Sequence, residues 1–245
     1  MPFNFQLINA PWNATEIARI VCEYDHALPL HAWPNWVLGN HDNSRVASRI
    51  GARQARVAAM LLLTLRGTPT LYYGDEIGMA DGAIPPDRVQ DPAELRQPAI
   101  GQGRDPERTP MQWDGSRNAG FSSGVPWLPI GGGDCVNVVD QDSKTSSMLT
   151  FYRRLLALRG SEPALVEGAI ERVVSSGSVL TYERHLGDDR FFIALNMAGA
   201  NAPVETPEGT LVLSTTGGHE GERIERLSLL LAGDEGIVIR ASDPA

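Results

Sequence analysis

The sequence is poor in cysteine, has no excess of basic residues and contains no long apolar run. Cys22 and Cys135 are its only cysteines, so a disulfide scaffold is not expected, and we expect two reduced, buried thiols. The formal charge of -9 argues against a nucleic-acid or anionic-membrane partner, because both attract basic patches. No apolar run approaches the roughly 18 residues of a membrane helix. Residues 58–65 read as a core helix.

Two further signals are missing. Met1 does not open a signal peptide, which favours a cytoplasmic location. Asp87, Asp91 and Asp105 are too dispersed for a calcium loop, which needs oxygen ligands in a short run, so no metal or other cofactor is predicted. The 245 residues are 42% hydrophobic, enough for a substantial core in one large domain or two ordinary ones.

Residues 36–79 read as a βαβ unit. A short apolar strand at 36–38 is followed by a polar turn, a helix with an apolar face, and a second strand at 70–73. Residues 67–69, Gly-Thr-Pro, are expected to end the helix. The apolar face repeats at helical spacing and comprises Val57, Met60, Leu61, Thr64 and Leu65.

Acidic turns follow both predicted strands, with His41 and Asp42 after the first and Asp75 and Glu76 after the second. Strand C-termini of parallel α/β sheets carry the chemistry, which makes these residues site candidates. From the residues alone, an Asp here is more often a cap, and His41 more often structural. Asp75 and Glu76 should point to opposite faces of a strand, with Glu76 a structural hydrogen-bonding residue.

The rest of the chain supplies a strand at 3–8, a helix capped by Asn13, an irregular segment at 84–133 and a helix at 146–159 closed by Gly160. Beyond Pro163 only strands are expected, which predicts an antiparallel sandwich. They fall at residues 170–175, 179–184, 191–196, 211–214, 227–231 and 237–240, with a hairpin turn at 187–189.

The motifs GNHD (39–42), GTPTLYYGDEIGM (67–79) and GRDPERTPMQWD (103–114) resemble those of α-amylase-type glycoside hydrolases, glycoside hydrolase family 13. The last is similar to the α-glucosidase and oligo-1,6-glucosidase branch. The resemblance implies an α/β fold, with about strands 6–8 of a (β/α)8 TIM barrel followed by a small antiparallel β-sandwich. The expected domains are residues 1–163, including a long loop at 80–145, and residues 164–245.

The resemblance also implies roles. Asp42 would be the catalytic carboxylate that stabilises the transition state, and His41 would contact the same sugar. Arg104 would bind far hydroxyls of the terminal glucose, with Arg108 supporting the site. The family's nucleophilic Asp and acid/base Glu would lie upstream of Phe3, so the chain alone is expected to be inactive. Its partners would be a disaccharide or oligosaccharide α-glucoside and, if expressed separately, the N-terminal barrel portion.

The predicted function is therefore that of a retaining, exo-acting α-glucosidase acting on short α-glucosides. Three alternatives stay open at this point. One is glucosyl transfer or isomerisation, as in trehalose synthase or sucrose isomerase. Another is a non-catalytic amylase-like scaffold, and the third is a carbohydrate-binding chain based on residues 164–245.

Overall fold

The computed structural model describes residues 2–29, 31–131, 136–225 and 228–242. The chain folds into two compact units. Unit 1 comprises residues 1–38, 56–70 and 153–245, and unit 2 comprises residues 39–55 and 71–152. Two helices, α4 (Ala52–Thr64) and α7 (Met148–Ser161), run from one unit into the other. Cys135 lies outside the described residues, whereas Cys22 is half-buried and free.

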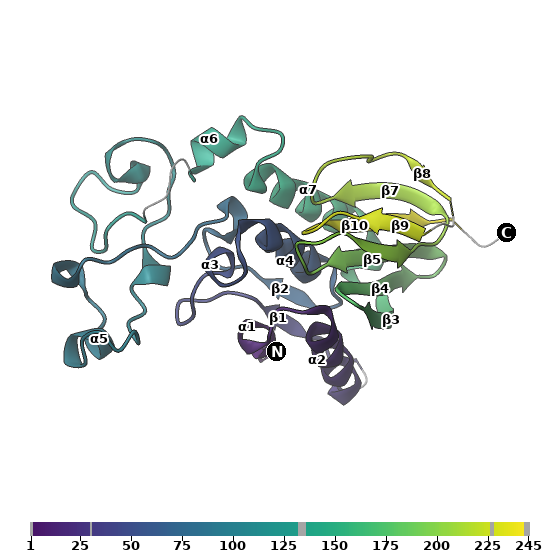
Figure 1. The fold of residues 1–245 in the computed structure, drawn as a ribbon, viewed down its shortest axis with the longest axis horizontal. Coiled ribbons are helices and arrows are strands. Elements are labelled where there is room, and N and C mark those ends of the chain that lie inside the picture. The colour runs from purple at the N-terminus through teal and green to yellow at the C-terminus, as the bar shows by residue number, and fades with distance from the viewer. Residues whose placement is uncertain (1, 30, 132–135, 226–227, 243–245) are drawn as a thin grey trace. The chain divides into compact units, whose positions relative to one another are not determined.

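Unit 1 contains the predicted βαβ unit. β1 (Asn35–Val37) pairs in parallel with β2 (Thr68–Thr70), with α4 between them in the chain (Figure 1). Asn4 forms an isolated parallel bridge to Trp36, so three chain segments lie side by side. The predicted helix face is confirmed, since its five members are all at most 1% exposed.

The strand predicted at 3–8 is wrong beyond that bridge, because the chain turns into helix α1 (Gln6–Asn9). The Asn4 side chain accepts a hydrogen bond from the Gln6 N–H at 2.8 Å, a local turn that competes with strand pairing.

The capping prediction is confirmed: Asn13 Oδ1 accepts the Glu16 N–H at 2.9 Å at the start of α2 (Ala14–Ala27). Gly160 does not end α7, which continues to Ser161.

The C-terminal end of α4 and the loop after it are held by two arginines of unit 1. Arg184 is fully buried and donates to the carbonyls of Thr64, Gly168 and Ala169. Arg159 donates to the carbonyls of Leu63, Leu65 and Gly67. Cationic side chains satisfy the unpaired carbonyls at a helix C-terminus and interact well with its dipole.

The predicted antiparallel strands are present in unit 1. In the described part of the chain, one sheet has the strand order β3-β4-β5-β10-β7-β8, and β6 pairs with β9, one of the predicted strands (Figure 1). The Leu186–Asp189 pairing closes a two-residue hairpin at the predicted turn. The strands are β3 (Ala169–Ser176), β4 (Val179–Leu186), β5 (Asp189–Asn196), β6 (Ala202–Glu205), β7 (Gly209–Ser214), β8 (Arg223–Ile224), β9 (Ser228–Leu231) and β10 (Gly236–Ala241).

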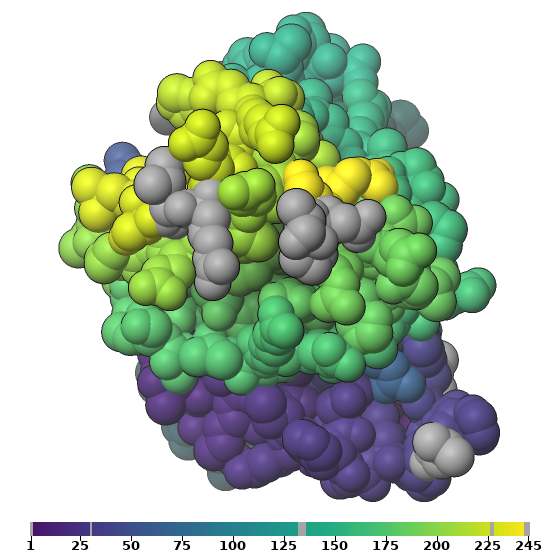
Figure 2. All heavy atoms as spheres, turned by 90° about the vertical axis from the view of Figure 1, so that its right-hand side faces the viewer, coloured from purple at the N-terminus to yellow at the C-terminus, as the bar shows by residue number. Residues whose placement is uncertain are grey.

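Side chains from both sheets share one apolar core, in which Val204 and Leu231 of the β6–β9 pair pack with Phe192 and Ile239. Strands β6 and β8 and helix α8 (Pro163–Val166) were not predicted, and Leu227 lies outside the described residues. α2 lies against β3 and β4, and Figure 2 shows the purple N-terminal residues adjoining the green ones.

Unit 2 is built from short helices and irregular chain. Its small apolar core gathers Ile77, Met79, Met111 and Leu149. None of the helices in the described ranges has both the length and the apolar content required to cross a membrane. The remaining elements are α3 (Val46–Ile50), η1 (Asp75–Ile77), η2 (Pro86–Arg88), α5 (Pro92–Arg96), η3 (Pro106–Arg108), η4 (Arg117–Gly120) and α6 (Val138–Asp142).

The strand predicted at 70–73 ends at Thr70. Beyond it the Tyr73 carbonyl accepts from Arg45 Nη1 at 2.6 Å, and Gly74 turns the chain with a φ of 87°. Asp75 and Glu76 therefore lie in the 3-10 helix η1 rather than on a strand. The expectation that they point to opposite faces of a strand is wrong for this reason.

Candidate active site

The structure brings Asp42, Arg104 and Arg108 together within unit 2. Arg104 Nη1 and Arg108 Nη2 each donate to the same oxygen, Asp42 Oδ1, at 3.0 Å. The Asp42 side chain is 43% exposed, so the carboxylate remains accessible from solvent. Two cations on a half-exposed carboxylate form a polar site rather than a packing contact.

His41 completes the cluster. Its Nε2 lies 3.3 Å from Asp42 Oδ2, on the carboxylate oxygen that the arginines leave open. Its backbone carbonyl accepts from Arg108 Nε at 2.8 Å. All four predicted site residues are therefore linked by direct polar contacts.

A local turn presents Asp42. The side chain of Asn40 accepts from the Asp42 N–H at 2.9 Å and from Asn43 Nδ2 at 3.0 Å. Such an Asx turn fixes the backbone two residues on. It orients the Asp42 side chain without using its carboxylate.

The cluster keeps Asp42 ionised. Desolvation acts to raise the pKa of its carboxyl, but the hydrogen bond from Arg104, the charge of His41 and the bond from Arg108 outweigh it, so the pKa lies below its ordinary value. An ionised carboxylate can accept hydrogen bonds from hydroxyl groups and stabilise a developing positive charge.

Asp91 also belongs to the cluster, although the sequence analysis assigned it no role. Its Oδ2 accepts from Arg104 Nε at 2.7 Å and from the Arg104 N–H at 3.0 Å. The sequence does carry one signal: an Asp followed by Pro92 is typical of a helix N-cap. That pattern predicts the cap but not the contact with Arg104.

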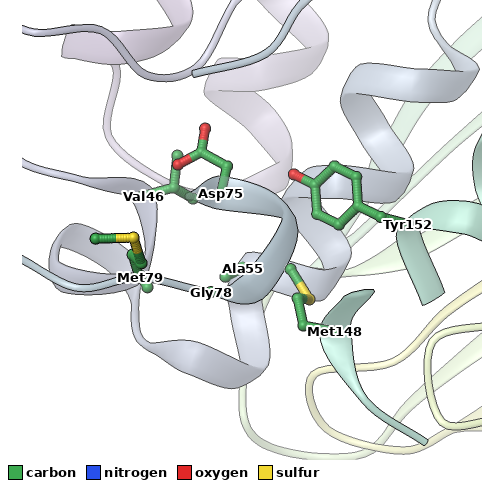
Figure 3. A pocket seen from close by; sticks show the side chains of 8 residues that line it. Val46, Ala55, Asp75, Gly78, Met79, Met148 and Tyr152 are labelled. Carbon is green, nitrogen blue, oxygen red and sulfur yellow. The ribbon is translucent and has the colours of Figure 1, made fainter. Parts of the chain in front are cut away.

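Asp75 and Glu76 take other positions. Glu76 Oε2 accepts the Gly74 N–H at 2.7 Å, a structural bond. Asp75 is 7% exposed and lies at a cavity of about 10 Å³, the space of roughly one water molecule. Figure 3 shows Tyr152, Met148 and Met79 around the same cavity.

Burial raises the pKa of Asp75 to about 7, against the opposing charge of Arg45. Its Oδ1 has no hydrogen-bond partner in the described part of the chain. Arg45 is itself buried, with its guanidinium 4.6 Å from the ring centre of Tyr73. Within the described ranges no group of three or more His, Cys, Asp or Glu side chains could hold a metal ion.

The profile "Alpha amylase, catalytic domain" matches residues 3–168. This chain belongs to the α-amylase family. It is 40% identical to a salivary alpha-glucosidase of Aedes aegypti over 192 residues, which cover 75% of this chain and 33% of that protein. It is 28% identical to an oligo-1,6-glucosidase of Parageobacillus thermoglucosidasius over 89% of this chain and 45% of that protein.

Among solved structures, the α-glucosyl transfer enzyme XgtA is similar, with a TM-score of 0.86 and 31% identity. That match covers 98% of this chain and 46% of XgtA. The chain thus spans a third to a half of the length of these members of the α-amylase family.

Proposed function

We propose that this chain is the C-terminal part of a retaining, exo-acting α-glucosidase of the α-amylase family that hydrolyses short α-glucosides. One observation carries the proposal: two arginines from one irregular loop converge on Oδ1 of Asp42, the residue that the resemblance assigns as the stabilising carboxylate. The name of the salivary relative supports the α-glucosidase branch.

In this proposal Asp42 is the third carboxylate of the reaction. Retaining glycosidases use a nucleophilic carboxylate and an acid/base carboxylate, and their transition state resembles an oxocarbenium ion. Held ionised, Asp42 hydrogen-bonds sugar hydroxyls more strongly as positive charge develops. His41 contacts the same sugar, Arg104 binds far hydroxyls of the terminal glucose, and Arg108 holds Asp42 in place.

The nucleophile and the proton donor are proposed to come from barrel strands upstream of Phe3. Residues 1–163 would then supply about strands 6–8 of the barrel with the loop at 80–145, and residues 164–245 the β domain. The parallel segments at Asn4, β1 and β2 support this placement.

Glucosyl transfer is the second candidate, supported by the similarity to XgtA. Both reactions begin with the same glucosyl-enzyme step and differ in whether water or a sugar hydroxyl accepts the glucosyl group. Product analysis distinguishes them, because hydrolysis of maltose yields two glucose molecules, whereas transfer releases one glucose as the leaving group and places the other in a new glucoside.

The test measures glucose release from maltose and isomaltose. The 245-residue chain alone should show no turnover, and the chain joined to upstream barrel strands should show activity that Asp42→Asn abolishes. Asp87→Asn, an exposed position in η2, is the matched control. Turnover by the purified chain alone, or full activity of Asp42→Asn in the joined protein, would refute the proposal.

A further inference from the structure

Asp91 is the most buried member of the cluster around Asp42. Its side chain is 0% exposed, and both of its oxygens accept hydrogen bonds. Oδ1 accepts the Ala93 N–H at 2.9 Å, which caps α5. Oδ2 accepts two donors of a single residue, Arg104.

The contact between Asp91 and Arg104 is an ion pair. The hydrogen bond from the Arg104 side chain, followed by that from the Ala93 N–H, holds the pKa of Asp91 well below its ordinary range. Asp91 is therefore a carboxylate, and the guanidinium of Arg104 balances it. A buried charge without such a partner is costly, so Asp91 strongly favours the Arg104 rotamer seen here.

This contact fixes the direction of the rest of Arg104. A guanidinium is planar, so fixing Nε together with the backbone N–H of the same residue sets the plane in which Nη1 lies. Nη1 then reaches Asp42 Oδ1 at 3.0 Å. Although the Arg104 side chain is 41% exposed, its orientation toward Asp42 is set from the buried side.

A reciprocal contact holds Asp91 in turn. Asp105 Oδ2 accepts the N–H groups of Gln90 at 2.6 Å and Asp91 at 2.9 Å. Asp105 thus accepts hydrogen bonds from residues 90 and 91, while Asp91 accepts hydrogen bonds from Arg104. Together these bonds hold the two ends of the intervening loop, which contains α5, next to each other.

We propose that Asp91 is a positioning residue of the glycosidase site: it orients Arg104 so that Nη1 engages Asp42. The inference rests on the proposed function, because only there does the Arg104–Asp42 contact serve a reaction. Arg108 provides an internal comparison, since its Nε is held by the His41 carbonyl and not by Asp91.

Asparagine cannot replace this aspartate. It offers one acceptor oxygen, whereas both Asp91 oxygens accept, so its amide NH2 would face either the Ala93 N–H or the Arg104 donors. Asp91→Asn therefore tests the contact with little change in side-chain size. Asp87→Asn, at an exposed position in η2 just before this loop, is the matched control.

The first readout is the NMR signal of the arginine Nε–H groups in the 245-residue chain. In Asp91→Asn, solvent exchange of the Arg104 Nε–H should speed up about tenfold or more, while that of Arg108 should not change. Asp87→Asn should alter neither. An Arg104 signal that remains as protected as in the wild type both in Asp91→Asn and in Asp91→Ala, which leaves no acceptor for the Nε–H, would overturn the proposal, and this outcome does not depend on any enzymatic activity.

The second readout is kcat/KM of the chain joined to upstream barrel strands. Asp91→Asn should reduce it by roughly 10–100-fold, the range expected when a group near the reaction is misplaced by about 1 Å. In an Arg104→Ala background the same change should cost less than about twofold. Full additivity of the two substitutions would refute the positioning role, because Asp91 would then act independently of Arg104.

Arg104→Lys covers the case in which Asp91→Asn does not fold. Lysine still balances the charge of Asp91 but has no planar fork. It should fold and lose kcat/KM to a similar extent, and a lysine variant with wild-type kcat/KM would overturn the inference. If Asp42→Asn leaves the joined protein active, the proposed function fails, while the Nε–H result still decides whether Asp91 holds Arg104.

Discussion

Replacing Asp75 by asparagine should remove a loss of stability that accompanies rising pH. The carboxyl is 7% exposed, and burial raises its pKa from 3.8 to about 7. The folded state therefore binds a proton that the unfolded chain has already released. The resulting stability is fully present below about pH 3.8 and is lost as the pH rises through about 7.

The size of the effect follows from the same two pKa values. Each pKa unit between the unfolded and the folded value corresponds to about 1.4 kcal/mol of unfolding free energy, which gives roughly 4 kcal/mol in total. By the linkage relation, about 2.5 kcal/mol of the unfolding free energy should be lost between pH 5 and pH 8. Asparagine keeps the shape and cannot ionise, so it should not show the loss.

The assay is urea unfolding of the 245-residue chain at several pH values, for the wild type, Asp75→Asn and the exposed control Asp87→Asn. The unfolding free energy of the wild type should fall relative to Asp75→Asn by about 2.5 kcal/mol from pH 5 to pH 8. The control should follow the wild type. If Asp75→Asn and the wild type show parallel pH profiles, the carboxyl titrates normally and the reasoning is wrong.

Two further substitutions test contacts of unit 1 by chemical unfolding. Arg184→Met should lower the unfolding free energy by about 3 kcal/mol, because the buried carbonyls of Thr64 and Gly168 and the partly buried carbonyl of Ala169 lose a donor, and a change below about 1 kcal/mol would contradict that role. Asn13→Ala should cost about 1 kcal/mol by removing the cap of α2, whereas Asn13→Asp, which keeps an acceptor oxygen, should retain most of the stability.

Local patterns predicted those parts of the fold that local forces determine. The cap at Asn13 and the buried face of α4 follow from spacing alone. The strand expected at 3–8 failed because the Asn4 side chain bonds the Gln6 N–H, a contact that apolar content does not reveal. The prediction that Gly160 ends α7 also failed: the helix continues to Ser161, although glycine usually favours a helix end.

The candidate site was predictable only in part. No periodicity indicates that Arg104 meets Asp42, 62 residues earlier in the chain, and that expectation came from the motifs. Asp91 could have been recognised as a cap before Pro92, but its bond to Arg104 depends on an irregular loop. The burial of Asp75 follows from the turn at Gly74, which the strand prediction did not include.

The two arginines at the end of α4 limit how the chain can be cut. A truncation after residue 163 would keep Arg159 but remove Arg184, together with Tyr182, whose hydroxyl lies 2.5 Å from that of Thr64. The carbonyl of Thr64 would lose the donor it has in the intact chain. An engineered version of residues 1–163 should therefore carry a new C-terminal cap for α4, such as a cationic residue placed to reach Thr64.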